Sequence, residues 1–244
     1  MSVYQIIAQN ISANKKMLAA LLDPDVFVGQ RLAAIIDILR SSPPDFIFVG
    51  GSTTCESIEK LIIKLKSELT IPVVLFPGNV SQFVPSADAL LNISLVSGRN
   101  AEYLIGQHVT AAMAIKNSEI EIIPTAYLLI DGERVSSTEY VSNTRPIPAD
   151  RTNIAVSTAL AGEQLGMRAI YLEAGSGAKT PVNAEMITAV RQQTSVPLIV
   201  GGGIRTTEQL QAAFEAGADL VVVGNILEKE PQKFLNFKNL SFFK

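Results

Sequence analysis

Short apolar runs alternate along this chain with longer segments in which apolar residues recur every three or four positions. The short runs are rich in Leu, Ile and Val, which predicts strands of a parallel sheet buried on both faces, and the longer segments predict amphipathic helices. The predicted strands are Met17–Leu22, Phe46–Val49, Val73–Phe76, Ala89–Leu95, Ile120–Ile130, Ala169–Glu173, Leu198–Val200 and Leu220–Val223. The helical segments are 31–40, 55–68, 100–116, 155–166, 182–193 and 206–216.

Eight strands that alternate with helices predict an α/β fold of the (β/α)8 TIM-barrel type. The 244 residues fit this fold as one domain, residues 1–244, because such barrels run to about 250 residues. The gap after the third strand is short, so we expect an abbreviated or missing helix there. The last segment has clear end signals, with Thr206 at its start and Gly217 after its end.

Two segments depart from the alternation. The stretch from Asp131 to Asp150 is polar and follows a clearly predicted strand, so in a barrel it would lie on the carboxyl-end face. It would form a lid, a subunit contact or simply a solvent-exposed loop. Near the C-terminus, we expect four phenylalanines to pack a last helix onto the barrel, in preference to an oligomer contact or membrane attachment. They are Phe234, Phe237, Phe242 and Phe243.

Composition and charge narrow the class of protein. With 48% apolar residues the chain is not disordered, and 20 basic against 23 acidic residues give no electrostatic reason for nucleic-acid binding. A small anion held by backbone amides stays possible. No apolar run is long enough for a transmembrane segment, and the start of the chain lacks a secretory pattern. A lone Cys55 fits a reducing compartment, so we expect cytoplasmic residence.

Glycines follow the last two predicted strands. Gly201, Gly202 and Gly203 end the seventh, and Gly224 with Asn225 ends the eighth. Backbone amides at glycine-rich turns before helices bind phosphate, and many barrels carry a phosphate site at this place. Structural turns alone explain either group, but the two together favour phosphate binding.

The sixth strand carries a candidate general base. Alternation places Tyr171 and Glu173 on one side of the strand and Leu172 on the other, and the turn 175–177 adds amides and a hydroxyl. A carboxylate facing inward beside a phosphate site is poorly explained by packing. The alternative is an internal salt bridge to a Lys or Arg of the barrel.

The first strand leads directly into Asp23, Pro24 and Asp25. Mg²⁺ takes one or two carboxylates and completes its shell with water and substrate phosphate, so Asp23 is a candidate ligand. Ser52, after the second strand, supplies a hydroxyl on the same face. Helix capping is the competing interpretation for these residues, and it suits Asp25 better than Asp23.

Two residues with reactive side chains rank lower. We expect His108, the only histidine, to be a surface or capped residue. Cys55 has no neighbouring base, and we assign it to packing.

Together these motifs resemble the geranylgeranylglyceryl phosphate synthase family, prenyltransferases of ether-lipid synthesis, over nearly the whole chain. The sequence resembles the branch that lacks a lysine two positions before the metal aspartate, since that position is Leu21. Val26 likewise stands where relatives often have a basic residue, so roles given to that base do not transfer. The motifs are 22–25, 49–52, 124–127, 171–177, 201–204 and 224–225.

The resemblance implies transfer of a geranylgeranyl group from its diphosphate to the 3-hydroxyl of sn-glycerol 1-phosphate, assisted by Mg²⁺. It assigns Mg²⁺ and diphosphate to Asp23 and Ser52. The chemistry of the side chains agrees, since Glu173 would accept the hydroxyl proton and the ring face of Tyr171 would stabilise the allylic cation. We also expect a homo-oligomer. The residues assigned to glycerol phosphate are Tyr171, Leu172, Glu173, Ala174, Gly175, Ser176, Gly177, Gly202, Gly203, Gly224 and Asn225.

Three alternatives stay open at this point. The prenyl chain could have another length. The barrel could be an isomerase or synthase of another phosphorylated metabolite, although that would not explain Asp23 together with the Tyr171 and Glu173 strand. It could also be a phosphate-sensing or lipid-binding protein without catalysis.

Overall fold

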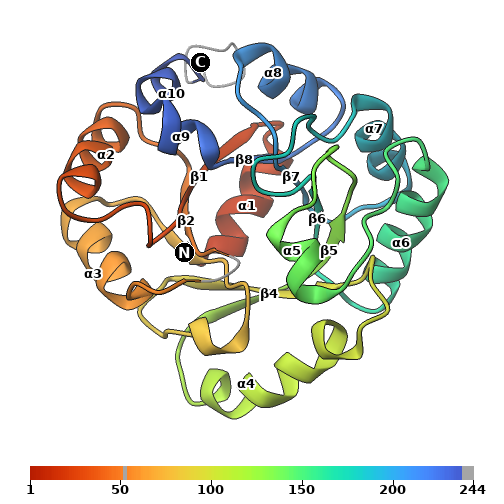
Figure 1. Cartoon of the computed structure of the whole chain (residues 1–244), viewed down its shortest axis with the longest axis horizontal. Coiled ribbons are helices and arrows are strands. Elements are labelled where there is room, and N and C mark those ends of the chain that lie inside the picture. The colour runs from red at the N-terminus through yellow and green to blue at the C-terminus, as the bar shows by residue number, and fades with distance from the viewer. Residues whose placement is uncertain (52–53, 238–244) are drawn as a thin grey trace.

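A computed structural model describes residues 1–51 and 54–237. Eight parallel strands form a closed barrel in chain order, and β8 closes it by pairing with β1, as the ring in Figure 1 shows. The fold is therefore the predicted TIM barrel. The strands are β1 (Met17–Leu22), β2 (Phe46–Val49), β3 (Val73–Leu75), β4 (Ala89–Leu95), β5 (Glu121–Leu129), β6 (Ala169–Glu173), β7 (Leu198–Gly201) and β8 (Leu220–Val223).

Helices surround the strands in the same alternating order (Figure 1). Their ends follow local chemistry: the Thr206 hydroxyl and the Gln209 side chain form the capping box that begins α8, and Gly217 has a φ of 114° after its end. The helices are α1 (Val3–Ser12), α2 (Gly29–Ser41), α3 (Ile58–Glu68), α4 (Gln107–Lys116), α5 (Ser137–Ser142), α6 (Thr152–Gln164), α7 (Ala184–Gln193), α8 (Thr207–Glu215), α9 (Asn225–Lys229) and α10 (Phe234–Phe237). None of those in the described ranges is both long and apolar enough to cross a membrane.

The helix after β3 is missing, as the short gap predicted. A single 3-10 turn, η1 (Val80–Gln82), takes its place before β4. Each predicted strand bound matches the structure or differs by one residue. The predicted helix 55–68, however, becomes helical only at Ile58, where the Ser57 hydroxyl caps α3. Cys55 consequently lies in the preceding loop and is exposed, so its assignment to packing is wrong.

The first helix and the irregular start of the fourth were not predicted from the sequence. Helix α1 lies across the middle of the ring in Figure 1 and closes the amino-terminal end of the barrel with Val3 and Ile7. The Glu121 carboxylate accepts the Val3 and Tyr4 amides at 2.6 and 3.2 Å and so holds the start of this helix. The predicted helix 100–116 begins with a π-helical turn, η2 (Glu102–Gly106).

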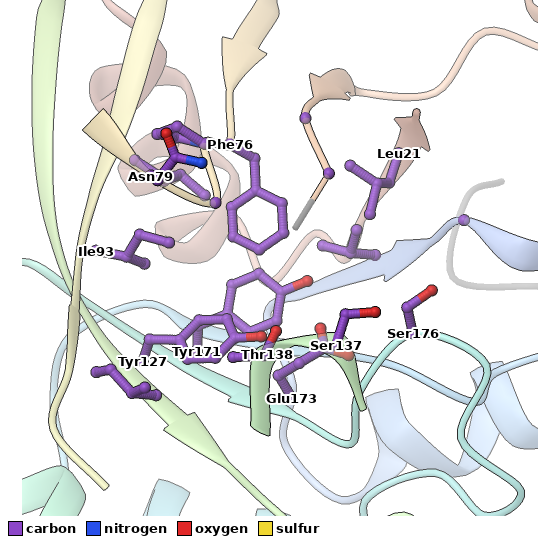
Figure 2. A pocket seen from close by; sticks show the side chains of 18 of the residues that line it. Leu21, Phe76, Asn79, Ile93, Tyr127, Ser137, Thr138, Tyr171, Glu173 and Ser176 are labelled. Atoms are coloured by element: carbon purple, nitrogen blue, oxygen red, sulfur yellow. The ribbon is translucent and has the colours of Figure 1, made fainter. Parts of the chain in front are cut away.

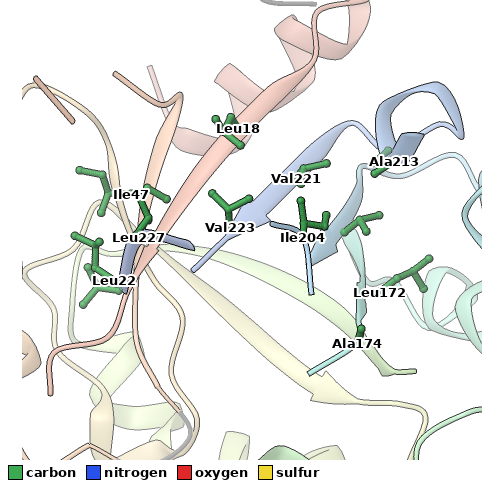
Figure 3. Packing of buried hydrophobic residues seen from close by; sticks show 14 of the residues in the cluster. Leu18, Leu22, Ile47, Leu172, Ala174, Ile204, Ala213, Val221, Val223 and Leu227 are labelled. Atoms are coloured by element: carbon green, nitrogen blue, oxygen red, sulfur yellow. The ribbon is translucent and has the colours of Figure 1, made fainter. Parts of the chain in front are cut away.

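Alternation along the strands separates two apolar cores. One lies inside the barrel and includes Phe46, Leu91 and Tyr171. The other lies between the strands and the surrounding helices, where Figure 3 shows Leu172 and Val221 pointing outward toward neighbouring helices. Because every strand contributes to both cores, its side chains are buried on both faces, and the strand runs are mostly apolar.

The two irregular segments both pack against the barrel. In the 131–150 stretch, α5 covers the carboxyl-end face, and Ile147 forms a bridge with Ile130 at the end of β5. At the C-terminus, Phe234 and Phe237 are buried against the helical layer, which confirms the predicted packing for these two residues. Phe242 and Phe243 lie outside the described residues.

Candidate active site

A cavity of about 280 Å³ opens at the carboxyl ends of the strands. One end is polar and lies among the turns that follow β1, β6, β7 and β8. The other end is apolar and lies between β4 and α4, where Leu90, Ala111 and Ile115 line it. A ligand with an anionic head and an apolar tail fits this division.

Aromatic rings form the wall between the two ends. The Phe76 and Tyr171 rings are stacked with centroids 5.3 Å apart and planes 3° apart, and Tyr127 lies 5.3 Å from Tyr171. Figure 2 shows the three rings grouped at the centre of the cavity, with Glu173 next to them. Ring faces carry negative potential, so this wall can stabilise a cation beside it.

Glu173 ends β6 with its carboxyl group inside the barrel. The Gly175 amide donates to its Oε1 at 2.8 Å. Burial raises the pKa of Glu173 to about 7, and the Gly175 amide and the nearby Tyr171 hydroxyl offset only part of the rise. Among the described residues no Lys or Arg pairs with Glu173, so the internal salt bridge considered for it is absent there. A carboxyl group with a pKa near neutrality is suited to accept a proton.

The Tyr171 hydroxyl is one of two buried side-chain polar atoms that have no hydrogen-bond partner in the described part of the chain. Burial and the neighbouring Glu173 charge raise the pKa of Tyr171 well above its usual value, so the hydroxyl stays protonated. A buried hydroxyl without a partner is costly, and a bound ligand would relieve that cost. Both this hydroxyl and Glu173 lie against Gly201, where any side chain would collide with them.

The turns after β6, β7 and β8 meet beside Glu173. Gly202 and Gly203 have φ of 82° and 74°, which glycine adopts without strain. The Asn225 side chain joins the turns, since its Oδ1 accepts the Gly177 amide at 2.7 Å and its Nδ2 donates to Glu228 at 3.3 Å. Gly202, Gly203, Gly224 and Asn225 line the polar end of the cavity, where the predicted phosphate site would lie.

Asp23 lines the same end from β1. Its Oδ1 accepts the Asp25 amide at 2.9 Å, and a side chain on Gly51 would come within 2.9 Å of its Oδ2. Asp25 instead accepts the Cys55 and Glu56 amides at 2.9 and 2.7 Å, so it stabilises the loop after β2. The helix capping considered for Asp25 is wrong, because Val28 precedes α2 without a side-chain cap and Ser57 caps α3. Ser52, the second predicted metal ligand, lies outside the described residues.

The predicted site residues do not all face the cavity. The side chains of Leu172 and Ala174 pack in the outer core, as Figure 3 shows, so only their backbone could meet a ligand. The Gly175 and Gly177 amides are already bonded to Glu173 and Asn225. The remaining predicted residues line the cavity: Asp23, Tyr171, Glu173, Ser176, Gly202, Gly203, Gly224 and Asn225.

Sequence reasoning missed several lining residues. Phe76 directly follows β3 and Tyr127 lies on β5, both on inward positions that alternation identifies once the fold is known. His108 was expected at the surface or capped, but it is partly buried and lines the cavity, with its ring nitrogens 2.8 Å from Ser94 Oγ and 2.9 Å from Asn92 Oδ1. Glu228, on α9, had no sequence signal apart from its charge.

Comparison with known proteins places the chain in a family. A profile of the PcrB family matches residues 10–240. The geranylgeranylglyceryl phosphate synthases of Spirosoma linguale and Flavobacterium johnsoniae are 46% and 44% identical to it, over 90% and 96% of this chain and 88% and 96% of theirs.

A crystal structure agrees with these matches. The (S)-3-O-geranylgeranylglyceryl phosphate synthase of Thermoplasma acidophilum, solved in complex with its substrate sn-glycerol-1-phosphate, superposes with a TM-score of 0.90 at 35% identity. The match covers 100% of this chain and 97% of that one. The chain therefore belongs to the PcrB family, together with the geranylgeranylglyceryl phosphate synthases.

Proposed function

We propose that this protein is a geranylgeranylglyceryl phosphate synthase that joins the geranylgeranyl group of geranylgeranyl diphosphate to the 3-hydroxyl of sn-glycerol 1-phosphate. The observation that carries the proposal is Glu173, a buried carboxyl group with a pKa of about 7 beside the unpartnered Tyr171 hydroxyl. Both groups lie where the polar end of the cavity meets its apolar end. The two similar bacterial synthases and the substrate complex of the archaeal relative support the same assignment.

The polar end would hold glycerol phosphate. Gly202, Gly203 and Gly224 allow the backbone to approach a phosphate closely, and Ser176 offers a hydroxyl at the same end. Glycerol bound there would have its 3-hydroxyl near Glu173 and Tyr171. This arrangement explains how a chain with a net charge of −3 can bind anions without a basic surface.

The transfer step follows from these positions. The bond between C1 of the prenyl chain and the diphosphate oxygen breaks, and C1 forms a bond with the 3-oxygen of glycerol phosphate. Glu173 accepts the hydroxyl proton, and diphosphate leaves with the electron pair. The stacked rings of Phe76 and Tyr171 face the position where allylic positive charge develops and stabilise it.

The oxygen donors near Asp23 fit Mg²⁺. Among the described residues no three acidic, His or Cys side chains form a cluster, so the metal would depend on one or two carboxylates and on substrate oxygens, as Mg²⁺ often does. Asp23, with the Ser52 hydroxyl predicted beside it, would hold the ion, and Glu228 lines the same end. Bound Mg²⁺ would neutralise charge on the departing diphosphate.

Two further expectations accompany this function. Self-association of the chain stays a prediction, which sedimentation of the purified protein would test. Cytoplasmic residence is likewise a proposal, and fractionation of cells from the source organism would test it.

The direct test is a product analysis. Purified protein would be incubated with sn-glycerol 1-phosphate, Mg²⁺ and a series of prenyl diphosphates of different length, and the products identified by mass. We expect the 20-carbon donor to give geranylgeranylglyceryl phosphate fastest. A faster reaction with another donor would correct the chain length, and no product from any donor would contradict the proposal. Binding of glycerol phosphate without transfer would indicate a phosphate sensor.

A further inference from the structure

Gln82 is a buried amide in the segment that replaces the missing helix. It ends η1 and its side chain is only 5% exposed, whereas the neighbouring Ser81 is exposed. A buried carboxamide needs partners for both its donor and its acceptor. Its partners therefore show which parts of the molecule it connects.

The Gln82 side chain bridges two loops that line the cavity. Its Oε1 accepts the Gly78 amide at 2.7 Å, and its Nε2 donates to the Gly51 carbonyl at 3.0 Å. Gly78 belongs to the loop after β3, and Gly51 belongs to the loop after β2. An amide N–H on one side and a carbonyl on the other determine which end of the carboxamide faces each loop.

These loops approach each other closely at the point where their strands stop pairing. The Phe76 amide donates to the Val49 carbonyl at 2.8 Å, and a side chain on Gly50 would overlap the Phe76 carbonyl oxygen. Beyond this contact, the Gly51 carbonyl accepts its hydrogen bond within the described residues from Gln82. Gln82 thus continues the connection between the loops past the end of the sheet.

The Gly51 peptide is also part of the wall beside Asp23. A side chain on Gly51 would lie 2.9 Å from Asp23 Oδ2, so a shift of this peptide would change the space around that carboxylate. Phe76 and Asn79, from the loop that Gln82 holds on its other side, appear in Figure 2 on the side of the cavity opposite Ser137 and Ser176. Gln82 therefore supports the wall opposite the glycerol phosphate turns.

We propose that Gln82 is a positioning residue for the prenyl diphosphate: its carboxamide fixes the Gly51 carbonyl and the Gly78 amide, and thereby the wall next to Asp23 that receives the diphosphate. This inference rests on the function proposed above. It predicts that Gln82 affects the binding of the diphosphate and leaves the binding of glycerol phosphate unchanged.

Three variants separate positioning from general stability. Gln82→Glu keeps an oxygen for the Gly78 amide but replaces the donor to the Gly51 carbonyl by an acceptor, and Gln82→Met removes both bonds at similar length. Thr194→Val is the matched control, because it removes a buried hydroxyl bonded to the Val190 carbonyl in the helical layer. Thr194 does not line the cavity.

The measurement is calorimetric titration of the full-length protein with inorganic diphosphate in the presence of Mg²⁺, and separately with sn-glycerol 1-phosphate. In both Gln82 variants we expect diphosphate to bind roughly tenfold more weakly, since a buried carbonyl loses its donor, while glycerol phosphate binds within about twofold of the wild type. In turnover assays the KM for prenyl diphosphate should rise by a similar factor with little change in the KM for glycerol phosphate. Thr194→Val should lower Tm without changing either affinity.

Unchanged diphosphate binding in both Gln82 variants would overturn the inference. Equal loss of both ligands would also overturn it, because Gln82 would then act only on the stability of the fold. A wild-type protein that binds Mg²⁺ and diphosphate but forms no prenyl product would contradict the proposed function alone, and one that binds no diphosphate would contradict both.

Discussion

The carboxyl group of Glu173 combines a chemical advantage with a cost in stability. Water would stabilise its charged form, but the barrel interior replaces water with apolar side chains and a hydrogen bond from the Gly175 amide. The pKa of Glu173 is consequently about 7, so near neutral pH the group exists in both protonation states. A base with this pKa accepts a proton readily and can lose it again after turnover.

The first prediction concerns activity. Since only the carboxylate can accept the hydroxyl proton, kcat of the wild type should rise with pH up to about 7 and level off above it, following the pKa of Glu173. Glu173→Gln should lower kcat by roughly a hundredfold or more, as the loss of a general base does, and should abolish this pH dependence. Rates from pH 5 to 9 at saturating substrates would check it. Activity close to that of the wild type would remove Glu173 from the role of base.

The second prediction concerns stability. The folded pKa of Glu173 is about 7 and the usual value is 4.5, so the folded state binds more protons than the unfolded state between these values. The contribution of Glu173 to stability therefore falls as pH rises through this window, by about 3 kcal/mol in all. Glu173→Gln should have a higher Tm than the wild type at pH 8 and a smaller advantage at pH 5. A lower Tm of the variant at pH 8 would show that the carboxylate makes stabilising contacts in addition to the hydrogen bond from the Gly175 amide.

At the scale of elements, the strand runs are predictable because each strand is buried on both faces, and its neighbours are fixed by the closed order of the barrel. The missing helix after β3 is predictable because a short gap leaves no room for one. Helix α1 has a local signal that the sequence analysis did not use, the capping box of Ser2 and Gln5, whereas its attachment through Glu121 is distant in the chain. The turn η2 is not predictable in this way, since the Ser94 hydroxyl reaches its Leu104 carbonyl from β4. The pattern of apolar and polar residues within a segment does not indicate its contacts with residues far away in the chain.

The third prediction concerns the turn after β7. A methyl group on Gly202 would collide with Glu173 Oε1 and lie 2.8 Å from the amide nitrogens of Ala174 and Gly175. Gly202→Ala should therefore displace the base and lower kcat/KM by about a hundredfold, as small misplacements of reacting groups do.

Gly166→Ala provides the control for backbone strain. Its φ of 89° is similar to the 82° of Gly202, but a methyl group there meets nothing within 4 Å. Gly166→Ala should lose only the stability that the backbone strain costs, Gly202→Ala should lose more because of its added collisions, and only Gly202→Ala should lose activity. Equal activity in the two would mean that the turn can move without displacing Glu173.

At the scale of the whole molecule, the barrel explains why much of the site is predictable from one sequence. All eight strands end on one face, so residues that directly follow strands, such as Asp23, Gly202 and Asn225, converge although they are far apart in the chain. The positions of Gln82 and His108 could not be predicted in this way, because both residues lie on segments that do not directly follow a strand. Their positions depend on how η1 and α4 pack, which strand order does not determine.

The fourth prediction follows from the two ends of the barrel being separate. Helix α1 closes the end opposite the cavity, and Glu121 holds its first turn through the Val3 and Tyr4 amides. Glu121→Ala should lower the free energy of unfolding by about 1–2 kcal/mol, as loss of a helix cap does, and Tm by roughly 2–8 °C.

Glu119→Ala removes an exposed carboxylate two residues earlier and should leave Tm nearly unchanged. In both variants the KM values and kcat should stay within about twofold of the wild type when measured well below Tm, because the inner core lies between α1 and the cavity and its dense packing holds the strands in place. A clear change in KM for either substrate in Glu121→Ala would show instead that loosening α1 shifts the strands along the barrel. The positions of the turns at the carboxyl ends of the strands would then depend on α1.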